Sequence, residues 1–381
     1  MSFELVESPS RTAVIKVIGI GGCGGNAVEH MVSKSVSGVE FIAANTDLQA
    51  LGELDPGITM QIGAEVTKGL GAGADPDIGR AAAMEDRARL QDAITGADMV
   101  FVTAGMGGGT GTGAAPVVAQ IAKDLDTLTV GVVTKPFAWE NRTKAAQQGI
   151  VELTHHVDSL IAIPNDKLLT VLPEEVTMED AFSASNDVLL GAVQGIADII
   201  LRPGRINVDF ADVCTVMRER GVAIMGTGQA SGEGRAQEAT EKAIHSPLLE
   251  DVDLHDARGV LVNITTGPSL GIREYADVGT MVREFAAKEA TVVVGAVNDP
   301  DIGEDMRVTV VATGLGGERK PGLAAVGNLD TAPAAAPGEY RGYDEPAIGR
   351  ARSAGAEPPP PLEADDSEIL DLPSFLRRNA S

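Results

Sequence analysis

Three glycine-rich segments of the sequence have the composition of phosphate-binding loops. The densest is residues 107–113, Gly-Gly-Gly-Thr-Gly-Thr-Gly, with five glycines in seven positions. Glycines let the backbone turn tightly and direct successive N–H groups at one anion, and the hydroxyls of Thr110 and Thr112 can donate hydrogen bonds to phosphate oxygens. No lysine follows these glycines, as one would in a Walker loop. The segment therefore predicts a phosphate site of a different design.

A second segment, residues 19–25, matches the fingerprint of dinucleotide-binding folds. Gly19, Gly21 and Gly24 have the G-x-G-x-x-G spacing. Asp47 follows 23 residues after Gly24, where an acid that binds ribose would lie. This motif alone is compatible with a nicotinamide-dependent oxidoreductase. That alternative leaves residues 107–113 unexplained, and no catalytic His/Arg set stands out among the five histidines.

The third segment, residues 68–73, reads Lys-Gly-Leu-Gly-Ala-Gly. All three segments are expected beyond strand ends, which suits a ligand with several phosphates, and a nucleoside triphosphate fits best. Hydrolysis of such a ligand needs a positioned water and a metal such as Mg²⁺, with little covalent help. The glycine segments contain no obvious residue that would activate water.

Candidates for that role come much later in the chain, at Asn207, Asp209 and Asp212. Asp209 and Asp212 are three residues apart, so both face one way if the turn is helical. Their carboxylates could orient water and hold a cation. The alternative is a structural role, because Asp is common at helix N-caps.

Alternating strands and helices are expected to position the glycine segments. Strands are predicted at residues 13–20, 39–45, 99–104 and 129–134, and helices at residues 26–33, 80–94 and 116–124. Pro116 would lie in the first turn of its helix, where a missing N–H has no consequence. This alternation is typical of a parallel, doubly wound α/β sheet.

A long helix at residues 178–202 is expected to lead into a second block. Its helices are predicted at residues 211–220 and 278–287, and its strands at residues 259–265, 291–296 and 306–313. The predicted parts are a flexible N-terminal tail (1–12), a Rossmann-like nucleotide-binding domain with a parallel sheet (13–177), a central helix (178–202), a second α+β domain (203–320), a disordered linker (321–366) and a docking peptide (367–381).

The last two parts differ in composition from the rest. Residues 321–366 hold 8 of the 20 prolines together with many Ala and Gly, so they cannot bury enough apolar surface to fold. We expect a flexible tether. An apolar rhythm returns in residues 367–381, and a short apolar motif beyond a disordered linker is typical of a docking peptide.

The net charge of −25 argues against nucleic-acid binding and against direct docking on an anionic membrane. The two cysteines, Cys23 and Cys214, form neither a disulfide framework nor a metal cluster, which favours a reducing cytoplasm. Residues 1–11 have no apolar region of a signal peptide. We also expect no apolar run long enough to insert into a membrane.

Several motifs together resemble those of the tubulin/FtsZ family. They are residues 107–113, the Gly-Ile-Gly-Gly-Cys-Gly-Gly-Asn start at 19–26, Asn45-Thr-Asp47 and Asn207-Val-Asp-Phe-Ala-Asp212. The likeness is collinear from about residue 13 to 316. It is to bacterial FtsZ rather than to tubulin, because Ile163-Pro-Asn-Asp-Lys-Leu168 and Ser246-Pro-Leu-Leu-Glu250 also match.

The resemblance implies a GTPase that binds GTP or GDP with Mg²⁺ and polymerises head to tail. A second domain would activate the neighbour's nucleotide site, with Asn207, Asp209 and Asp212 as catalytic residues. The polymer would form the cytokinetic ring at the midcell division site in the cytoplasm. A GTP-binding scaffold without hydrolysis is the remaining alternative within this class.

The resemblance also assigns the nucleotide site. In this reading Gly71–Gly73 approach the γ-phosphate, Glu140 binds ribose, Arg142 lies near the nucleotide, and Asn186 and Asp187 read guanine. The whole implied GTP-binding set is Gly21, Gly22, Cys23, Gly24, Gly25, Asn26, Asn45, Gly71, Ala72, Gly73, Gly107, Gly108, Gly109, Thr110, Gly111, Thr112, Gly113, Glu140, Arg142, Asn186 and Asp187. The family usually has two more residues between the glutamate and the arginine than Trp139-Glu-Asn-Arg142 has.

The C-terminal residues resemble the peptide with which the family binds adaptor proteins that tether the polymer to the membrane. The implied adaptor-binding residues are Leu370, Asp371, Leu372, Pro373, Phe375, Leu376 and Arg377.

Overall fold

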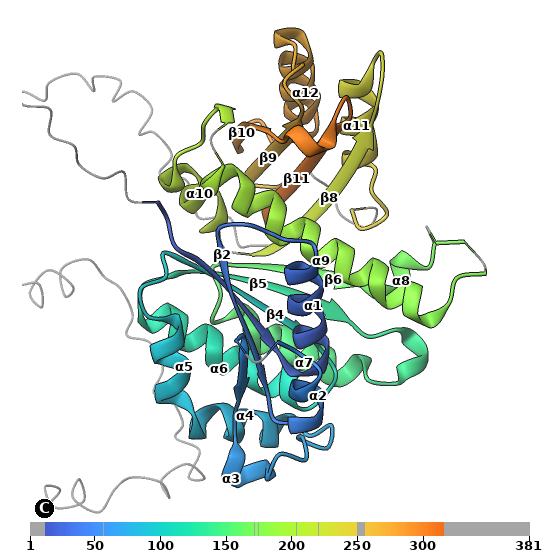
Figure 1. Ribbon diagram of the computed structural model, residues 1–381. Helices are drawn as coiled ribbons and strands as arrows, with labels where there is room; N and C mark the ends of the chain where they lie inside the picture. Colours follow the sequence, from blue (N-terminus) through green and yellow to red (C-terminus); the bar gives the residue numbers. More distant parts are fainter. Residues whose placement is uncertain are drawn as a thin grey trace, which may run out of the picture. The chain divides into compact units, whose positions relative to one another are not determined.

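The computed structural model describes residues 12–315, except residues 56, 171, 174, 203, 220 and 250–255. The predicted linker and docking peptide, and nearly all of the N-terminal tail, lie outside the described residues. The described strands form an 11-stranded sheet in the order β3-β2-β1-β4-β5-β6-β8-β11-β9-β10-β7 (Figure 1).

The first half of this sheet is parallel. Its strands are β1 (Ile15–Ile20), β2 (Val39–Asn45), β3 (Thr59–Gln61), β4 (Met99–Gly105), β5 (Leu128–Lys135) and β6 (Ser159–Pro164). Every residue of β1 is buried, as expected for a parallel strand covered on both faces. Ile15 and Val17 belong to one core cluster and Ile18 and Ile20 to another, because alternate side chains point to opposite faces.

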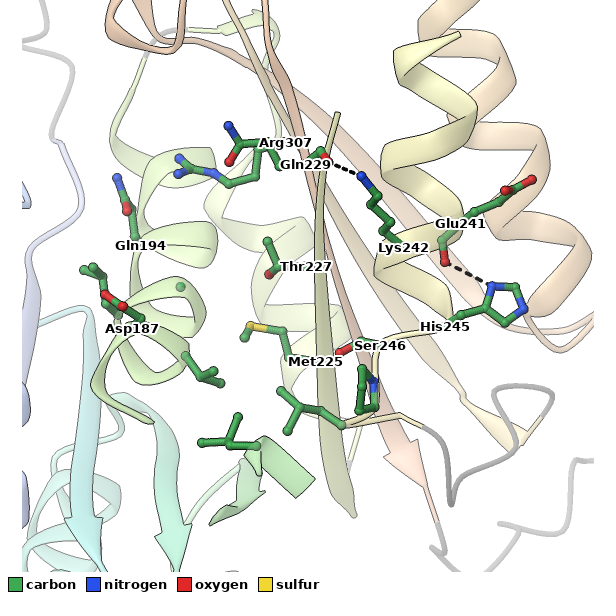
Figure 2. A pocket seen from close by; sticks show the side chains of 16 residues that line it. Asp187, Gln194, Met225, Thr227, Gln229, Glu241, Lys242, His245, Ser246 and Arg307 are labelled. Carbon is green, nitrogen blue, oxygen red and sulfur yellow. Dashed lines mark hydrogen bonds between the residues drawn. The ribbon is translucent and has the colours of Figure 1, made fainter. Parts of the chain in front are cut away.

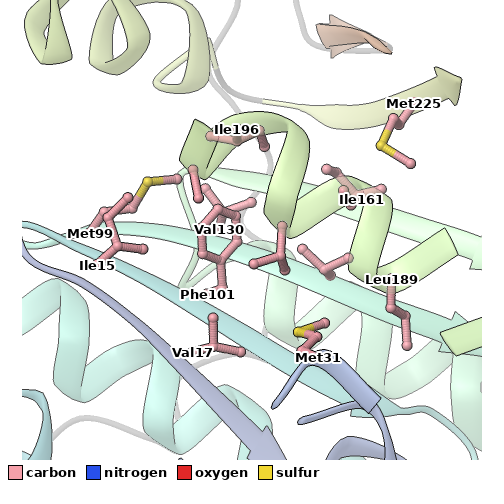
Figure 3. Packing of buried hydrophobic residues seen from close by; sticks show 14 of the residues in the cluster. Ile15, Val17, Met31, Met99, Phe101, Val130, Ile161, Leu189, Ile196 and Met225 are labelled. Atoms are coloured by element: carbon pink, nitrogen blue, oxygen red, sulfur yellow. The ribbon is translucent and has the colours of Figure 1, made fainter. Parts of the chain in front are cut away.

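Helices cover both faces of these strands. The first core joins the strands to α1 (Gly21–Ser33), α9 (Met178–Leu201) and α10 (Phe210–Met217). Figure 3 shows Ile196 of α9 over Val130 and Phe101, and Leu189 of the same helix on the side of Met31. The second core joins them to α4 (Pro76–Glu85), α5 (Arg87–Ile94), α6 (Thr110–Asp124) and α7 (Thr143–Thr154). Short helical segments complete the block: α2 (Leu48–Gly52), α3 (Ala64–Thr67), η1 (Ala138–Glu140) and α8 (Asn165–Leu168). The expected doubly wound arrangement is confirmed.

The second half of the sheet is mixed and has its own core. Its elements are β7 (Gly204–Ile206), β8 (Val222–Ala230), α11 (Arg235–Ile244), β9 (Gly259–Thr266), α12 (Ile272–Phe285), β10 (Thr291–Asn298), η3 (Pro300–Ile302) and β11 (Met306–Leu315). β11 runs antiparallel to both β8 and β9, and α11 and α12 contribute to the third core cluster. A short parallel pairing of β6 with β8 joins the two halves.

Helix α9 lies between the two halves (Figure 1), in contact with β5 and α1 on one side and with β9 and β10 on the other. By length and composition alone it would be long and apolar enough to cross a membrane, so the expectation that no such run exists was wrong. Its contacts with both halves of the sheet are those of a core helix.

Several predicted boundaries were wrong for identifiable reasons. The helix expected at 80–94 is two helices, broken at Asp86, whose carboxylate accepts hydrogen bonds from the Gly63 N–H and from Arg89. Helices α1 and α6 begin inside the glycine segments, at Gly21 and Thr110, so Pro116 lies within α6 and not in its first turn. Glycine's low helix propensity hides these starts from sequence patterns.

Strands β6 and β8 and helices α7 and α11 were not predicted. In β8, Gly226 and Gly228 resemble loop residues in the sequence. A Cβ on either would lie 2.0–2.1 Å from a carbonyl oxygen of α11. The glycines are therefore explained by the close approach of α11 to the strand.

Candidate functional site

Two of the glycine segments meet at the C-terminal ends of β1 and β4. Gly21 has a φ of +73°, and a Cβ at this position would lie 3.0 Å from the backbone nitrogen of Gly111. Gly113 lies farther back, where a Cβ would be 1.9 Å from the carbonyl oxygen of Pro76. The glycines thus permit both the contact between the segments and the tight packing of the helices behind them.

Both segments end as helix N-termini that no side chain caps. Neither Ile20, which precedes α1, nor Gly109, which precedes α6, supplies a capping side chain, and neither first turn contains an acid. The first N–H groups of an α-helix have no partner within the helix and carry the positive end of its dipole. Two such termini converging on one place favour an anion with several phosphates.

A cavity of about 310 Å³ lies between these two helix N-termini, and we name it the phosphate cavity. Nine of the predicted residues line it: Gly21, Gly22, Cys23, Gly108, Gly109, Thr110, Gly111, Glu140 and Arg142. The cavity therefore brings together predicted residues from the two main glycine segments and from the turn after β5.

Three other predicted residues support the cavity walls. The buried Thr112 uses its hydroxyl oxygen to accept the Gly107 N–H at 2.9 Å, so it shapes the loop. Asn45 is also buried, and its side-chain oxygen accepts the N–H of Thr46 at 2.8 Å. These contacts give Gly107, Thr112 and Asn45 a structural role in addition to the one predicted.

The third glycine segment is tied to the same place. Gly71 donates its N–H to the carbonyl of Thr46 at 3.2 Å, and the hydroxyls of Thr46 and Thr110 lie 2.7 Å apart. A Cβ on Gly109 would lie 2.9 Å from the Cβ of Ala72. The segment therefore packs behind Thr110 and Gly109, while Gly71, Ala72 and Gly73 do not themselves line the cavity.

The other predicted residues also lie outside the cavity lining. These are Gly24, Gly25, Asn26, Gly113, Asn186 and Asp187. A carboxylate oxygen of Asp187 lies 2.7 Å from Nε2 of His30 on α1. Asn26 is one helical turn before His30, so Asp187 lies near the face of α1 that carries Asn26.

Asp187 also lines a larger cavity of about 970 Å³ between α9 and the second half of the sheet. Figure 2 shows Asp187 and Gln194 from α9 on one side of it, and Met225, Thr227 and Gln229 of β8 facing them. No residue of the three glycine segments lines this cavity.

A tight turn brings Glu140 and Arg142 to the phosphate cavity together. Asn141 between them has a φ of +57°, and one Glu140 carboxylate oxygen accepts the Phe137 N–H at 2.9 Å. Arg142 packs on Gly107, because a Cβ added to Gly107 would lie 3.0 Å from the Cβ of Arg142. The segment Trp139-Glu-Asn-Arg142 therefore places the arginine at the cavity.

Seven lining residues were absent from the predicted site, among them Asn165 and Phe182. Phe182 is 44% exposed, and its ring lies edge-on to Phe137, 5.8 Å between centroids. The side-chain oxygen of Asn165 accepts a hydrogen bond from the Ser185 hydroxyl at 3.1 Å. The rarity of aromatic residues, 3% of the chain, was the signal available in the sequence for Phe182.

Cys23 faces the cavity and is accessible to solvent. Protein atoms crowd its thiol, and this desolvation raises the pKa of Cys23. The thiol therefore stays neutral at physiological pH and adds no negative charge beside the site.

The predicted catalytic residues lie elsewhere. Asp209 and Asp212 are exposed; Asp209 occupies the N-cap position of α10, but its side chain makes no capping hydrogen bond. The structural alternative of a capping carboxylate is therefore wrong for Asp209. Asn207 does have a structural contact, because its side-chain oxygen accepts the Gly204 N–H at 2.8 Å.

The acidic residues and the phosphate cavity lie near opposite ends of α9. Phe182, near the start of α9, lines the cavity, whereas Asn207 and Asp209 follow the far end of this helix of 24 residues, which is about 36 Å long at about 1.5 Å per residue. They line a separate hollow of about 690 Å³ with Ala13 and Asp98, at the N-terminal ends of β1 and β4. Within one copy, these acids cannot reach a ligand in the phosphate cavity.

Two parts of the chain match family models of known proteins. Residues 14–173 match the tubulin/FtsZ family, GTPase domain, and residues 221–316 match the FtsZ family, C-terminal domain. The chain belongs to the tubulin/FtsZ family. It is therefore a GTPase that binds guanine nucleotide.

Individual relatives agree with this membership of the FtsZ family. The cell division protein FtsZ of Pseudomonas aeruginosa is 55% identical over 392 residues, which cover 99% of this chain and 100% of that protein. The solved structure of an empty FtsZ dimer from M. jannaschii has a TM-score of 0.77 at 41% identity, covering 80% of this chain and 89% of that one. CetZ2 from Haloferax volcanii, a GTPγS-bound protofilament, has a TM-score of 0.66 at 21% identity, covers 79% and 93% of the two chains, and shares the fold.

The described residues of this FtsZ-family chain contain no group of three or more His, Cys, Asp or Glu side chains that could hold a metal ion. Mg²⁺ is usually held by substrate phosphates, waters and one or two carboxylates. A cavity with a single lining carboxylate, Glu140, fits a metal that arrives on the nucleotide.

Proposed function

We propose that this chain is a cell-division GTPase whose copies stack head to tail, so that Asn207, Asp209 and Asp212 of one copy complete the GTP site of the next. The observation that carries the proposal is the separation of these acids from the phosphate cavity by the length of α9. A head-to-tail contact brings opposite ends of two copies together. Hydrolysis then depends on assembly.

Within the nucleotide site each part has a distinct task. The uncapped N–H groups at the starts of α1 and α6 bind the phosphates, with Thr110 as a hydroxyl donor and Gly71–Gly73 beside the γ-phosphate. Glu140 binds the ribose hydroxyls, and the Arg142 guanidinium pairs with phosphate charge. Phe182 offers a face on which the base can stack.

Recognition of guanine would rest on the polar end of α9. A carboxylate is the acceptor that pairs with the N1–H and the amino group of guanine, so Asp187 suits this role, with Asn186 and Asn26 beside it. The hydrogen bond with His30 would hold the Asp187 carboxylate in position.

At the completed site, the neighbour's acids orient the attacking water toward the γ-phosphate. Asp209 and Asp212 are exposed and three residues apart at the start of α10, so both carboxylates can face an approaching copy. Mg²⁺ bound to the phosphates would neutralise the charge that develops on them. Direct hydrolysis within one copy is not part of this scheme.

The assay is GTP turnover per molecule as a function of protein concentration, with light scattering to report polymer. We expect turnover per molecule to rise steeply at the concentration where GTP and Mg²⁺, but not GDP, produce scattering. A dilute monomer that hydrolyses GTP as fast as a concentrated sample would exclude the shared site. Polymer that forms without any rise in phosphate release would also contradict hydrolysis at the contact between copies.

The relatives' name, cell division protein FtsZ, supports a place at the division site. We propose that the polymer forms a cytoplasmic ring at midcell and that Leu370, Asp371, Leu372, Pro373, Phe375, Leu376 and Arg377 bind membrane-tethering adaptors. Deleting residues 367–381 should leave GTP-dependent polymerisation intact and abolish cosedimentation with such an adaptor. Cosedimentation that survives the deletion would remove the docking role.

A further inference from the structure

Arg202, the residue that follows α9, bridges two carboxylates from different parts of the molecule. Its Nε lies 2.9 Å from an oxygen of Asp198 on α9, and its Nη1 lies 3.1 Å from an oxygen of Asp299, directly after β10. The side chains of Asp198 and Asp299 are 5% and 13% exposed, and that of Arg202 is 26% exposed. The guanidinium is therefore held between two nearly buried acids.

Asp299 is itself rigidly placed. Its N–H donates to the carbonyl of Thr266 at the end of β9, and its other carboxylate oxygen accepts the Asp301 N–H at the start of η3. Arg202 thus connects the end of α9 to the edge of the second half of the sheet.

The chain that leaves Arg202 folds back beside it. Gly204 and Ile206 pair with Val297 and Ala296 of β10, and the Gly204 N–H bonds to Asn207. As a result, Arg202 lines the same hollow as Asn207 and Asp209.

We propose that Arg202 is a positioning residue for GTP hydrolysis: by bridging Asp198 and Asp299 it holds the loop of Asn207, Asp209 and Asp212 in the orientation that reaches the neighbour's nucleotide. This inference rests on the proposed function, since it concerns the loop that each copy lends. Arg202 acts only through that loop and touches no nucleotide of its own copy.

The charges around Arg202 explain why the loop depends on it. Burial raises the pKa of Asp198, and Arg202 opposes this shift. Among the described residues, the second oxygen of Asp198 is one of the few buried polar atoms without a hydrogen bond. Without Arg202, two acids at the base of the loop would lose their shared cation.

Steady-state GTPase kinetics on Arg202→Met test the proposal. We expect kcat to fall about 10- to 100-fold, as for a misplaced catalytic group, while KM for GTP stays near that of the parent chain. The melting temperature should fall, because two nearly buried acids lose their cation, so the kinetics are measured at a temperature where circular dichroism shows the variant folded. Arg202→Lys should recover part of kcat, because it keeps one ion pair. Asp299→Asn, which leaves the pair with Asp198 intact, gives the same test if Arg202→Met does not fold. The matched control is Arg87→Met, which breaks an ion pair with Asp124 on α5 and α6.

A mixing experiment then identifies which side of the contact Arg202 serves. Asp212→Ala has a defective loop and an intact nucleotide cavity, so it should regain activity when mixed with the cavity variant Thr110→Ala. Mixed with Arg202→Met it should stay inactive, because neither copy lends a working loop. Regained activity with Arg202→Met, or an unchanged kcat, would overturn the proposal. If the parent chain itself shows no dependence on assembly, the proposed function fails first, independently of Arg202.

Discussion

The phosphate cavity and the loop of Asn207, Asp209 and Asp212 are built in opposite ways. The cavity consists mainly of backbone at the ends of buried strands, where glycines allow close contacts such as that between Gly21 and Gly111. The loop presents side chains to solvent and is held at a few points, by β7, by Asn207 and by Arg202. In the proposed scheme, one half of the site is complete in a single copy, while the other half depends on contact between copies.

Because of this difference, we expect substitutions in the cavity to change nucleotide binding and substitutions in the loop to change the rate of hydrolysis. Substitutions in the cavity should act through steric conflict and change nucleotide affinity together with local structure. Substitutions of Asp209 and Asp212 should remove a chemical group and leave the fold unchanged, because among the described residues the structure records no hydrogen bond or ion pair of these exposed side chains.

The largest effect is expected for Asp212→Ala. GTP binding should be retained while kcat falls about 10²- to 10⁴-fold, the usual contribution of a group that assists proton transfer. Filter binding and phosphate release on the same preparation measure the two quantities. Asp92→Ala, an exposed acid on α5, is the control and should behave as the parent chain. Phosphate release at the parent rate would remove Asp212 from catalysis.

A smaller effect is expected for Gly21→Ala. The left-handed φ of +73° and the 3.0 Å approach to Gly111 should force the two loops apart. We expect about a tenfold loss of GTP affinity, since this conformation costs an L-residue roughly 1–2 kcal/mol. Gly52→Ala, where a Cβ meets no atom within 4 Å, is the control. Equal affinity for Gly21→Ala and the control would mean that the contact between the loops does not shape the site.

The smallest effect on turnover is expected in the second domain, where the nearly buried Arg235 forms an ion pair at 2.7 Å with Glu274, whose side chain is 28% exposed. The hydrogen bond from Arg235 lowers the pKa of Glu274 below its ordinary 4.5. The stabilisation is therefore present above pH 4.5 and is lost as the pH falls through the lowered pKa. Glu274→Gln should destabilise the domain by about 3 kcal/mol at pH 7 and by less in acid.

Thermal melting between pH 7 and pH 3 measures this difference. The control is Glu238→Gln, because Glu238 pairs with Lys242 on the exposed face of α11 and such pairs contribute less than about 1 kcal/mol. A gap between Glu274→Gln and the parent chain that widens in acid would contradict the assigned sign.

Much of the site was predictable from local composition. The glycine segments at 19–25 and 107–113 indicated phosphate binding because few other tasks require so many glycines beside apolar strands. Phe182 and Asn165 were missed because their place at the cavity depends on how α9 packs across the sheet. Thr112 was predicted as a phosphate ligand, and its contact with the Gly107 N–H emerges only from the folded loop.

The sequence by itself determined the parallel α/β block and indicated a ligand with several phosphates, since these depend on residue type and short-range spacing. The guanine base and the proposed role of the acids came from the resemblance to the tubulin/FtsZ family. Tertiary structure alone decided that the acids lie about one α9 length from the cavity, because distance between remote segments follows from packing. It also decided that Arg202 joins α9 to β10, through carboxylates 101 positions apart in the chain. Contacts of that range leave no periodic trace in the order of residues.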